Sequence, residues 1–334
     1  MPRPLSEQTI VITGSSSGIG REAARRAGRR GARVVLAARN EAALEAAAGE
    51  VEQEGGRPHV EVTDMAEPDQ VDRLANRAAA RFGGIDTWVN CAGISAYGHF
   101  DDLAPEEIER VIRVDLLGAM HGARAALAHL RLRGGTLINV ASVLGAQPAP
   151  FQAPYCAAKA GLIAFGRSLR IELDQEEDTD VHVTTILPPS VNTPFFDHAR
   201  SRLGRAPKPM PPVYEPGVVA DSIVFAAEHP RHEIAVGAVG RQLTLLGRVA
   251  PEVGGLLFSR RSIGFAQQTR DAPPDDGDAL FDPSPSPAVR GRWGRASVPV
   301  SPYTRVFEHH PVPRPLGAAA GAMGRALSGM RRRG

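Results

Sequence analysis

The chain is poor in cysteine: Cys91 and Cys156 are the only two among 334 residues. Two cysteines form no disulfide framework, and this pair lacks the spacing of metal ligands, so no metal site is expected. Reduced thiols of a cytoplasmic protein are the default expectation. Cys156 is interpreted as a small packing residue rather than a nucleophile.

Long apolar runs and a strong net charge are also missing. No stretch reaches the roughly 18 uninterrupted apolar residues that a spanning helix needs, and residues 1–8 lack the apolar run of a signal peptide. The 39 basic and 37 acidic residues leave a net charge of only +2. We therefore expect a cytoplasmic protein with no nucleic-acid partner.

What the sequence does contain is a regular alternation of short apolar strands and helical stretches. Seven strands are predicted, at residues 9–13, 32–38, 59–63, 87–90, 136–141, 182–187 and 233–236. The longest helical stretch, residues 105–130, has one interruption near Gly118. This alternation predicts an α/β fold: a doubly wound, Rossmann-type parallel sheet of about seven strands with helices on both faces.

Composition divides the chain near residue 265. Residues 1–265 are predicted to form one nucleotide-binding catalytic domain, in which the irregular residues 190–215, with five prolines, are typical of a lid. Residues 266–334 are predicted to be a Pro/Arg-rich extension, largely irregular or disordered, because ten of the 28 prolines fall within residues 271–315. Residues 316–334 form at most a weak helix, and a solvated basic tail is favoured there over membrane contact.

A glycine-rich turn joins the first strand to the first helix. Gly14, Gly18 and Gly20 allow the backbone to approach a pyrophosphate, and the helix N-terminus supplies free N–H groups. The spacing differs from Gly-x-Gly-x-x-Gly, but the mechanics are the same. This turn predicts dinucleotide binding.

The ends of the second and third strands suggest which dinucleotide. Arg39 follows the second strand where an NAD-binding site would carry a carboxylate, and its planar fork suits a 2′-phosphate. Ser15 offers a further hydroxyl donor. Asp64, after the third strand, is a candidate partner for the adenine amine. The sequence therefore predicts NADP(H) in preference to NAD(H).

Tyr155 and Lys159 lie four residues apart at the start of a predicted helix, so they share one face. A cation beside a phenol favours the phenolate, which lowers its pKa from about 10 towards neutrality. Such a tyrosine can serve as a general acid or base. An isolated pair of this kind is a frequent coincidence, so its significance depends on the rest of the chain.

Together these motifs resemble the short-chain dehydrogenase/reductase family. The resemblance covers roughly residues 5–250 and is carried, in the family's order and spacing, by Thr13–Gly20, Asp64, Asn90–Gly93, Ser142, Tyr155 with Lys159, and Pro188–Thr193.

The resemblance implies a role for each matching residue. Tyr155 would be the acid/base, Lys159 would hold the nicotinamide ribose and lower the tyrosine pKa, and Ser142 would bind the substrate oxygen. Thr193 would donate to the nicotinamide carboxamide. The cofactor-binding set expected from the motifs and the resemblance is Gly14, Ser15, Ser17, Gly18, Ile19, Gly20, Arg39, Asp64, Asn90, Ala92, Gly93, Tyr155, Lys159, Pro188, Val191 and Thr193.

Two positions depart from the family's pattern. Asp115 stands where the family has an asparagine whose main-chain carbonyl holds a water next to the lysine. A carboxylate there would weaken the influence of Lys159 and raise the tyrosine pKa, so Asp115 joins the catalytic candidates. Pro189 replaces a glycine and removes an N–H donor from the loop.

The residues around these motifs predict a hydrophobic substrate pocket. Its candidates by position are Tyr97, Leu144, Gln147, Phe151 and Phe195. Their apolar character favours an oxidoreductase that transfers hydride between NADP(H) and a hydrophobic alcohol or carbonyl compound. The alternative is a low-turnover nucleotide-binding regulator or scaffold that interacts through its tail. The family resemblance also implies a homodimer or homotetramer.

Overall fold

The computed structural model describes residues 2–176, 179–259, 267–269, 271–272, 277–283, 287–294 and 297–309. The predictions for residues 316–334 lie outside this set. Within it, no helix combines the length and apolar character needed to cross a membrane.

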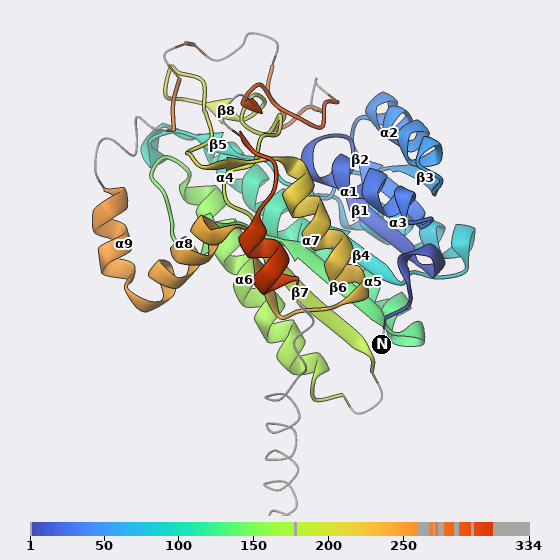
Figure 1. Cartoon of the computed structure of the whole chain (residues 1–334). Helices are drawn as coiled ribbons and strands as arrows, with labels where there is room; N and C mark the ends of the chain where they lie inside the picture. Colours follow the sequence, from blue (N-terminus) through green and yellow to red (C-terminus); the bar gives the residue numbers. More distant parts are fainter. Residues whose placement is uncertain are drawn as a thin grey trace, which may run out of the picture.

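A seven-stranded sheet forms the centre of the molecule (Figure 1). Its strands are β1 (Thr9–Thr13), β2 (Arg33–Ala38), β3 (Arg57–Val62), β4 (Thr87–Asn90), β6 (Gly135–Val140), β7 (Val181–Leu187) and β10 (Glu233–Ala235). Their order is β10-β7-β6-β4-β1-β2-β3, and every pair is parallel. The predicted doubly wound sheet of seven strands is confirmed. The order in which the strands are added reverses between β1 and β4. Sheets of this kind bind ligands at such a point, beside the carboxyl ends of the strands.

Helices cover both faces of the sheet. One layer holds α1 (Gly18–Arg29), α2 (Glu41–Gln53) and α7 (Pro216–Glu228), and the other holds α3 (Pro68–Phe82), α4 (Pro105–Ile112), α5 (Gly118–Arg133) and α6 (Ala153–Leu173). The inner strands are buried on both faces because each layer packs its own apolar cluster against them, whereas the edge strand β3 is partly exposed.

The predicted interruption of the long helix is a π-helical turn. Residues Arg113–Leu117 form this turn between α4 and α5, just before Gly118. A π turn inserts an extra residue into the helical ladder and is frequent at functional sites. Here it contains the buried Asp115.

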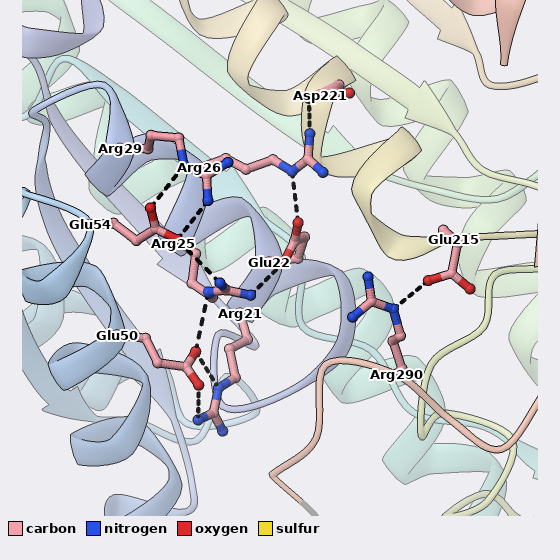
Figure 2. Close-up of polar contacts among 10 residues, drawn as sticks. All are labelled: Arg21, Glu22, Arg25, Arg26, Arg29, Glu50, Glu54, Glu215, Asp221 and Arg290. Atoms are coloured by element: carbon pink, nitrogen blue, oxygen red, sulfur yellow. Dashed lines mark hydrogen bonds and ion pairs between the residues drawn. The ribbon is translucent and has the colours of Figure 1, made fainter. Parts of the chain in front are cut away.

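Arginines on α1 tie it to both neighbouring helices (Figure 2). Arg25 and Arg29 bind Glu54 at the end of α2, and Arg26 bridges Glu22 on its own helix to Asp221 of α7. These ion pairs hold α1, whose N-terminus follows the glycine turn, against α2 and α7.

The described parts of the C-terminal region have defined contacts. After α8 (Ala238–Val249) and α9 (Pro251–Phe258), the short strand β11 (Ser297–Val298) pairs with β9 (Val213–Tyr214). The turn Thr304–Glu308 then lies beside α7, where His309 stacks on Phe225 at 4.6 Å between ring centroids. The division near residue 265 stays a prediction, but the described extension lies against the domain.

Candidate active site

A cavity of about 410 Å³ runs along the carboxyl ends of the strands. Its wall continues from the turn after β1 and the end of β2, past β4 and β6, to the start of α6 and the irregular residues after β7. The residues predicted for the cofactor and for catalysis that line it are Gly14, Ser17, Gly18, Ile19, Gly20, Arg39, Asp64, Ala92, Gly93, Ser142, Tyr155, Lys159, Pro188, Val191 and Thr193.

The glycine turn needs its glycines for two physical reasons. Gly14 has φ of 70° and Gly18 has φ of 53°, in the left-handed region that side chains disfavour. A Cβ on Gly20 would lie 2.4 Å from the carbonyl oxygen of Gly14. The backbone is therefore bare where α1 begins, which fits the pyrophosphate of a dinucleotide.

Two residues predicted to bind the cofactor are used inside the fold instead. The Oγ of Ser15 accepts a hydrogen bond from the Ala37 N–H at 2.9 Å, and this serine does not line the cavity. Asn90 donates to the Ala119 carbonyl and to Asn139, each at 2.9 Å, which links β4 to α5 and β6. Ser16 lines the cavity next to Ser15, and sequence position alone does not distinguish the two serines.

Ser142, Tyr155 and Lys159 converge on the cavity from two elements. Ser142 follows β6, whereas Tyr155 and Lys159 lie one turn apart on α6. The Lys159 Nζ is 5.5 Å from the centre of the Tyr155 ring and donates to the Val140 carbonyl at 3.3 Å. A phenol, a hydroxyl and an ammonium therefore border one space.

The pKa of Tyr155 is raised above its ordinary value, first because burial disfavours the phenolate. Lys159 acts in the predicted downward direction, as does a hydrogen bond with Ser142, while Asp115 adds to the rise. The expected net lowering by Lys159 does not occur because burial outweighs it. Near neutral pH the tyrosine is a protonated phenol, which can donate a proton.

Asp115 makes a direct ion pair with the catalytic candidate Lys159. Its Oδ2 lies 3.1 Å from the Lys159 Nζ, and its Oδ1 accepts the Ile94 N–H at 2.8 Å. Both charged side chains are almost fully buried. Burial lowers the pKa of Lys159, but Asp115 and Tyr155 together outweigh it, so the pKa is raised and the ammonium is kept.

Gly93 provides the room for this pair. A Cβ there would lie 3.1 Å from the Asp115 Oδ2 and 3.4 Å from the Lys159 Nζ. Because glycine leaves this space open, the backbone of the turn after β4 borders the cavity beside the lysine. Gly93, Tyr155 and Lys159 would thus border a nicotinamide and its ribose bound in this part of the cavity.

The other end of the cavity contains a second set of charges. Arg39 donates to the carbonyls of Ala279 at 2.6 Å and Phe281 at 2.7 Å, which belong to the C-terminal extension. Asp64 pairs with Arg110 at 2.6 Å. Sequence reasoning missed Arg110, which is not part of any of the motifs. These contacts use two of the five guanidinium N–H groups of Arg39.

The extension crosses the glycine turn as well. The Gly18 N–H donates to the Ala288 carbonyl at 3.1 Å, and Arg110 donates to the Leu280 carbonyl at 3.1 Å. The backbone N–H of Trp293 donates to the side-chain Oδ1 of Asn192, in the loop after β7, at 3.0 Å. The segment made of residues 277–283 and 287–294, which we call the strap, therefore lies at the end of the cavity beside Arg39 and the glycine turn. We call this the adenosine end, because the adenosine part of a dinucleotide is predicted to bind there.

The predicted substrate pocket is partly assembled. Tyr97, Leu144 and Phe195 line the cavity, and the Phe195 ring lies 5.6 Å from the Tyr155 ring. Gln147 and Phe151 do not line it. Gln147 is buried against Gly254 of α9, whose position no local pattern reveals.

Further lining residues come from two regions. Lys208, Met210 and Pro211 belong to the irregular residues 190–215, predicted to be a lid, whereas Phe258, Gln267 and Ala279 come from segments that sequence reasoning did not connect with the site. One signal was available: Lys208 and Lys159 are the two lysines among 39 basic residues. Among the described residues, no group of three or more His, Cys, Asp or Glu side chains is arranged to hold a metal ion.

The chain matches the family model for short chain dehydrogenase over residues 8–204. The Bacillus subtilis uncharacterized oxidoreductase YxnA is 36% identical over 326 residues, covering 95% of this chain and 88% of the relative. The 3beta-hydroxysteroid dehydrogenase 1 of Eggerthella lenta is 38% identical over 195 residues, covering 57% of this chain and 73% of the relative.

A solved structure agrees with these sequence matches. The alcohol dehydrogenase of the archaeon Thermococcus sibiricus, complexed with 5-hydroxy-NADP, is 27% identical with a TM-score of 0.59 over 67% of this chain and 91% of that chain. The family model spans more than half of the chain, and the Bacillus relative matches almost all of it. The chain belongs to the short-chain dehydrogenase/reductase family and is an NAD(P)-dependent oxidoreductase.

Proposed function

We propose that the protein transfers hydride between NADP(H) and a hydrophobic alcohol or carbonyl compound, with Tyr155 as the acid/base. The observation that supports this most is the convergence of Tyr155, Ser142 and Lys159 on the cavity that the glycine turn also borders. The 3beta-hydroxysteroid dehydrogenase relative acts, by its name, on a hydrophobic alcohol. The aromatic wall at Phe195 and Tyr97 supports the same substrate class here.

The chain's residues account for the proton and the charge. A bound nicotinamide supplies or accepts the hydride. In reduction, the Tyr155 hydroxyl donates its proton to the substrate oxygen, and the Ser142 hydroxyl hydrogen-bonds that oxygen as negative charge develops. Lys159 then stabilises the phenolate that remains, and Asp115 holds the ammonium in place. Because burial keeps the phenol protonated near neutral pH, Tyr155 is there in the state that can give a proton to the substrate oxygen.

The proposal of NADP(H) over NAD(H) rests on charge at the end of β2. Arg39 lines the cavity and Arg110 lies nearby. Of the two carboxylates that act on Arg39, Asp64 lines the cavity and is paired with Arg110, and Asp282 belongs to the strap. A 2′-phosphate would meet cations in this region. The Thermococcus relative, whose solved complex contains 5-hydroxy-NADP, supports the same preference.

Turnover of NADPH with a panel of aromatic and aliphatic ketones tests the function. Tyr155→Phe removes the proton donor but keeps the ring, so kcat should fall by about 10²- to 10⁴-fold. Circular dichroism and NADPH binding should stay unchanged. A Tyr155→Phe variant as active as the native protein would remove Tyr155 from the mechanism.

A second variant tests the cofactor preference. Arg39→Asp should lower kcat/KM for NADPH relative to NADH by about tenfold or more, because a charge-assisted contact becomes a repulsion. Both cofactors are compared at saturating ketone. An unchanged ratio of kcat/KM for NADPH to that for NADH would mean that Arg39 binds only the strap.

The formation of a homodimer or homotetramer also stays a proposal, and analytical ultracentrifugation tests it.

A further inference from the structure

The two lysines of this arginine-rich chain line the same cavity, but they are used differently. Lys159 is buried and paired with Asp115. Lys208 belongs to the irregular segment after β7 and is only half-buried. No carboxylate among the described residues forms an ion pair with it. Its ammonium is therefore a cation available at the cavity wall.

Two hydrogen bonds place Lys208 at the end of the cavity near Tyr155, which we call the substrate end. Its N–H donates to the Gln267 carbonyl at 2.9 Å. The Gln267 side chain in turn accepts from the Gln152 amide at 2.8 Å, and Gln152 caps α6 three residues before Tyr155. Lys208 is thus linked to the first turn of the tyrosine helix, away from the end of β2 where Arg39 lies.

The charges of the cavity wall are unbalanced at this end. Asp64 is the one carboxylate among the described lining residues, and it lies at the adenosine end, paired with Arg110. Met210 and Pro211, which follow Lys208 closely in the chain and also line the cavity, are apolar. An anionic group is costly to bury in apolar surroundings unless a cation pairs with it. Among the described lining residues near Tyr155, Lys159 is paired with Asp115, so Lys208 is the cation that selects where an anion can bind.

We propose that Lys208 forms an anion subsite, so that the substrate of the proposed reductase is a hydrophobic ketone or alcohol carrying a carboxylate-like group away from its reacting carbon. This inference rests on the proposed function and names its substrate class. Because Lys208 is half-exposed, water solvates the ammonium when a neutral substrate binds. Neutral ketones are then poorer substrates but not excluded ones.

The test compares a long-chain keto acid with its methyl ester, which differ in the anionic group and not in the ketone. The native protein should show a higher kcat/KM for the acid. Lys208→Gln should lower kcat/KM for the acid by about 10- to 100-fold and leave the ester within about twofold, as for loss of a charge-assisted hydrogen bond. Lys208→Arg should keep most of the preference. High salt should reduce the preference in the native protein.

Arg205→Gln is the matched control. Arg205 is exposed in the same loop, three residues from Lys208, and does not line the cavity. Its replacement changes the net charge equally and should leave the acid-to-ester ratio unchanged. Equal loss in both variants would show a general charge effect and overturn the subsite.

Binding measurements separate the subsite from the proposed function. Calorimetry of the keto acid and the ester with the NADP⁺ complex should show tighter binding of the acid, lost in Lys208→Gln. Such binding without turnover of any ketone would refute the reductase proposal and leave the subsite standing. Turnover of both compounds with no preference for the acid would overturn the subsite and leave the reductase. Weaker NADPH binding by Lys208→Gln would also overturn the subsite, because the lysine would then serve the cofactor.

Discussion

The residue that most changes the chemistry of this site is Asp115. From the sequence it is a departure from the family's asparagine, expected to weaken the influence of Lys159. The structure shows why the effect is direct: the carboxylate is buried 3.1 Å from the ammonium. It opposes the lysine in the pKa of Tyr155. Lys159 and Asp115 thus act in opposite directions on the Tyr155 pKa, so the pH dependence of kcat/KM is the measurement that reports a change in either residue.

Asp115→Asn should move the pH–rate profile to lower pH. Removing the negative charge leaves the Lys159 cation unopposed, which favours the phenolate and lowers the Tyr155 pKa. Alcohol oxidation needs the phenolate, so its rate should rise at a lower pH than in the native protein. Ketone reduction needs the phenol, so its decline on the alkaline side should begin earlier. Measuring kcat/KM against pH in both directions checks both signs.

The asparagine variant also carries its own structural control. The amide that replaces the carboxylate keeps an oxygen that can accept the Ile94 N–H, the contact that Asp115 makes through Oδ1. Asp115→Ala removes that acceptor too and should lose stability as well as shift the profile. A shift to higher pH in Asp115→Asn would contradict the prediction, since it would mean that Lys159 loses its charge once the carboxylate is gone.

At the scale of single elements, the sequence predicted what depends on local pattern. The strands, the glycine turn and the start of α6 follow from short β-branched runs, bare backbone and a proline, and all three are present. The π turn of Arg113–Leu117 was only approximated by an interruption at Gly118. One extra residue in a helical ladder leaves no periodic signal in so short a stretch. Its consequence, the placement of Asp115 against Lys159, needed the structure.

The contact between α1 and α2 predicts a pH-dependent stability. Arg29 and Arg25 lower the pKa of Glu54 to about 2. A depressed folded-state pKa stabilises the fold above the ordinary value of 4.5 and loses that effect as pH falls towards 2. Glu54→Gln should therefore lower the Tm slightly at neutral pH, and the difference should vanish on acidification.

Thermal unfolding between about pH 7 and pH 2 measures this, with Glu45→Gln on the exposed face of α2 as the matched control. Glu45 has no ion pair in the described part of the chain, so its variant should follow the native curve throughout. A constant offset of Glu54→Gln at every pH would point to lost packing rather than lost charge. The effect is small because an ion pair near the surface is well solvated.

At the scale of the whole molecule, the extension is where sequence reasoning fell short. Its proline content predicted an irregular segment, and its described backbone is mostly irregular. Composition could not show that its carbonyls meet Arg39, Arg110 and the Gly18 N–H. Backbone acceptors carry no residue-specific signal, and these contacts join residues more than 160 positions apart. The sequence therefore predicted an Arg39 guanidinium free to bind a phosphate, whereas in the structure it also donates to the strap carbonyls.

Asp278 anchors the strap to the rest of the protein, and its replacement can test how the strap affects cofactor binding. Asp278 accepts from Arg200 at 2.7 Å through Oδ2 and from the Leu280 N–H at 2.9 Å through Oδ1, just before the carbonyls that hold Arg39. Because Ala279 of the strap lines the same cavity as the glycine turn and Arg39, we expect the cofactor to bind under the strap and to leave only when it lifts.

Asp278→Ala should loosen this anchor and raise the rate of NADPH release by about three- to tenfold, as for the loss of one ion pair and one hydrogen bond. Stopped-flow fluorescence after mixing the NADPH complex with excess NADP⁺ measures that rate. Asp101→Asn, exposed and away from the cavity, is the control and should leave it unchanged. If the strap instead competed with the cofactor, Asp278→Ala would tighten NADPH binding by speeding its association, with release unaltered. The two rates therefore distinguish a segment that retains the cofactor from one that excludes it.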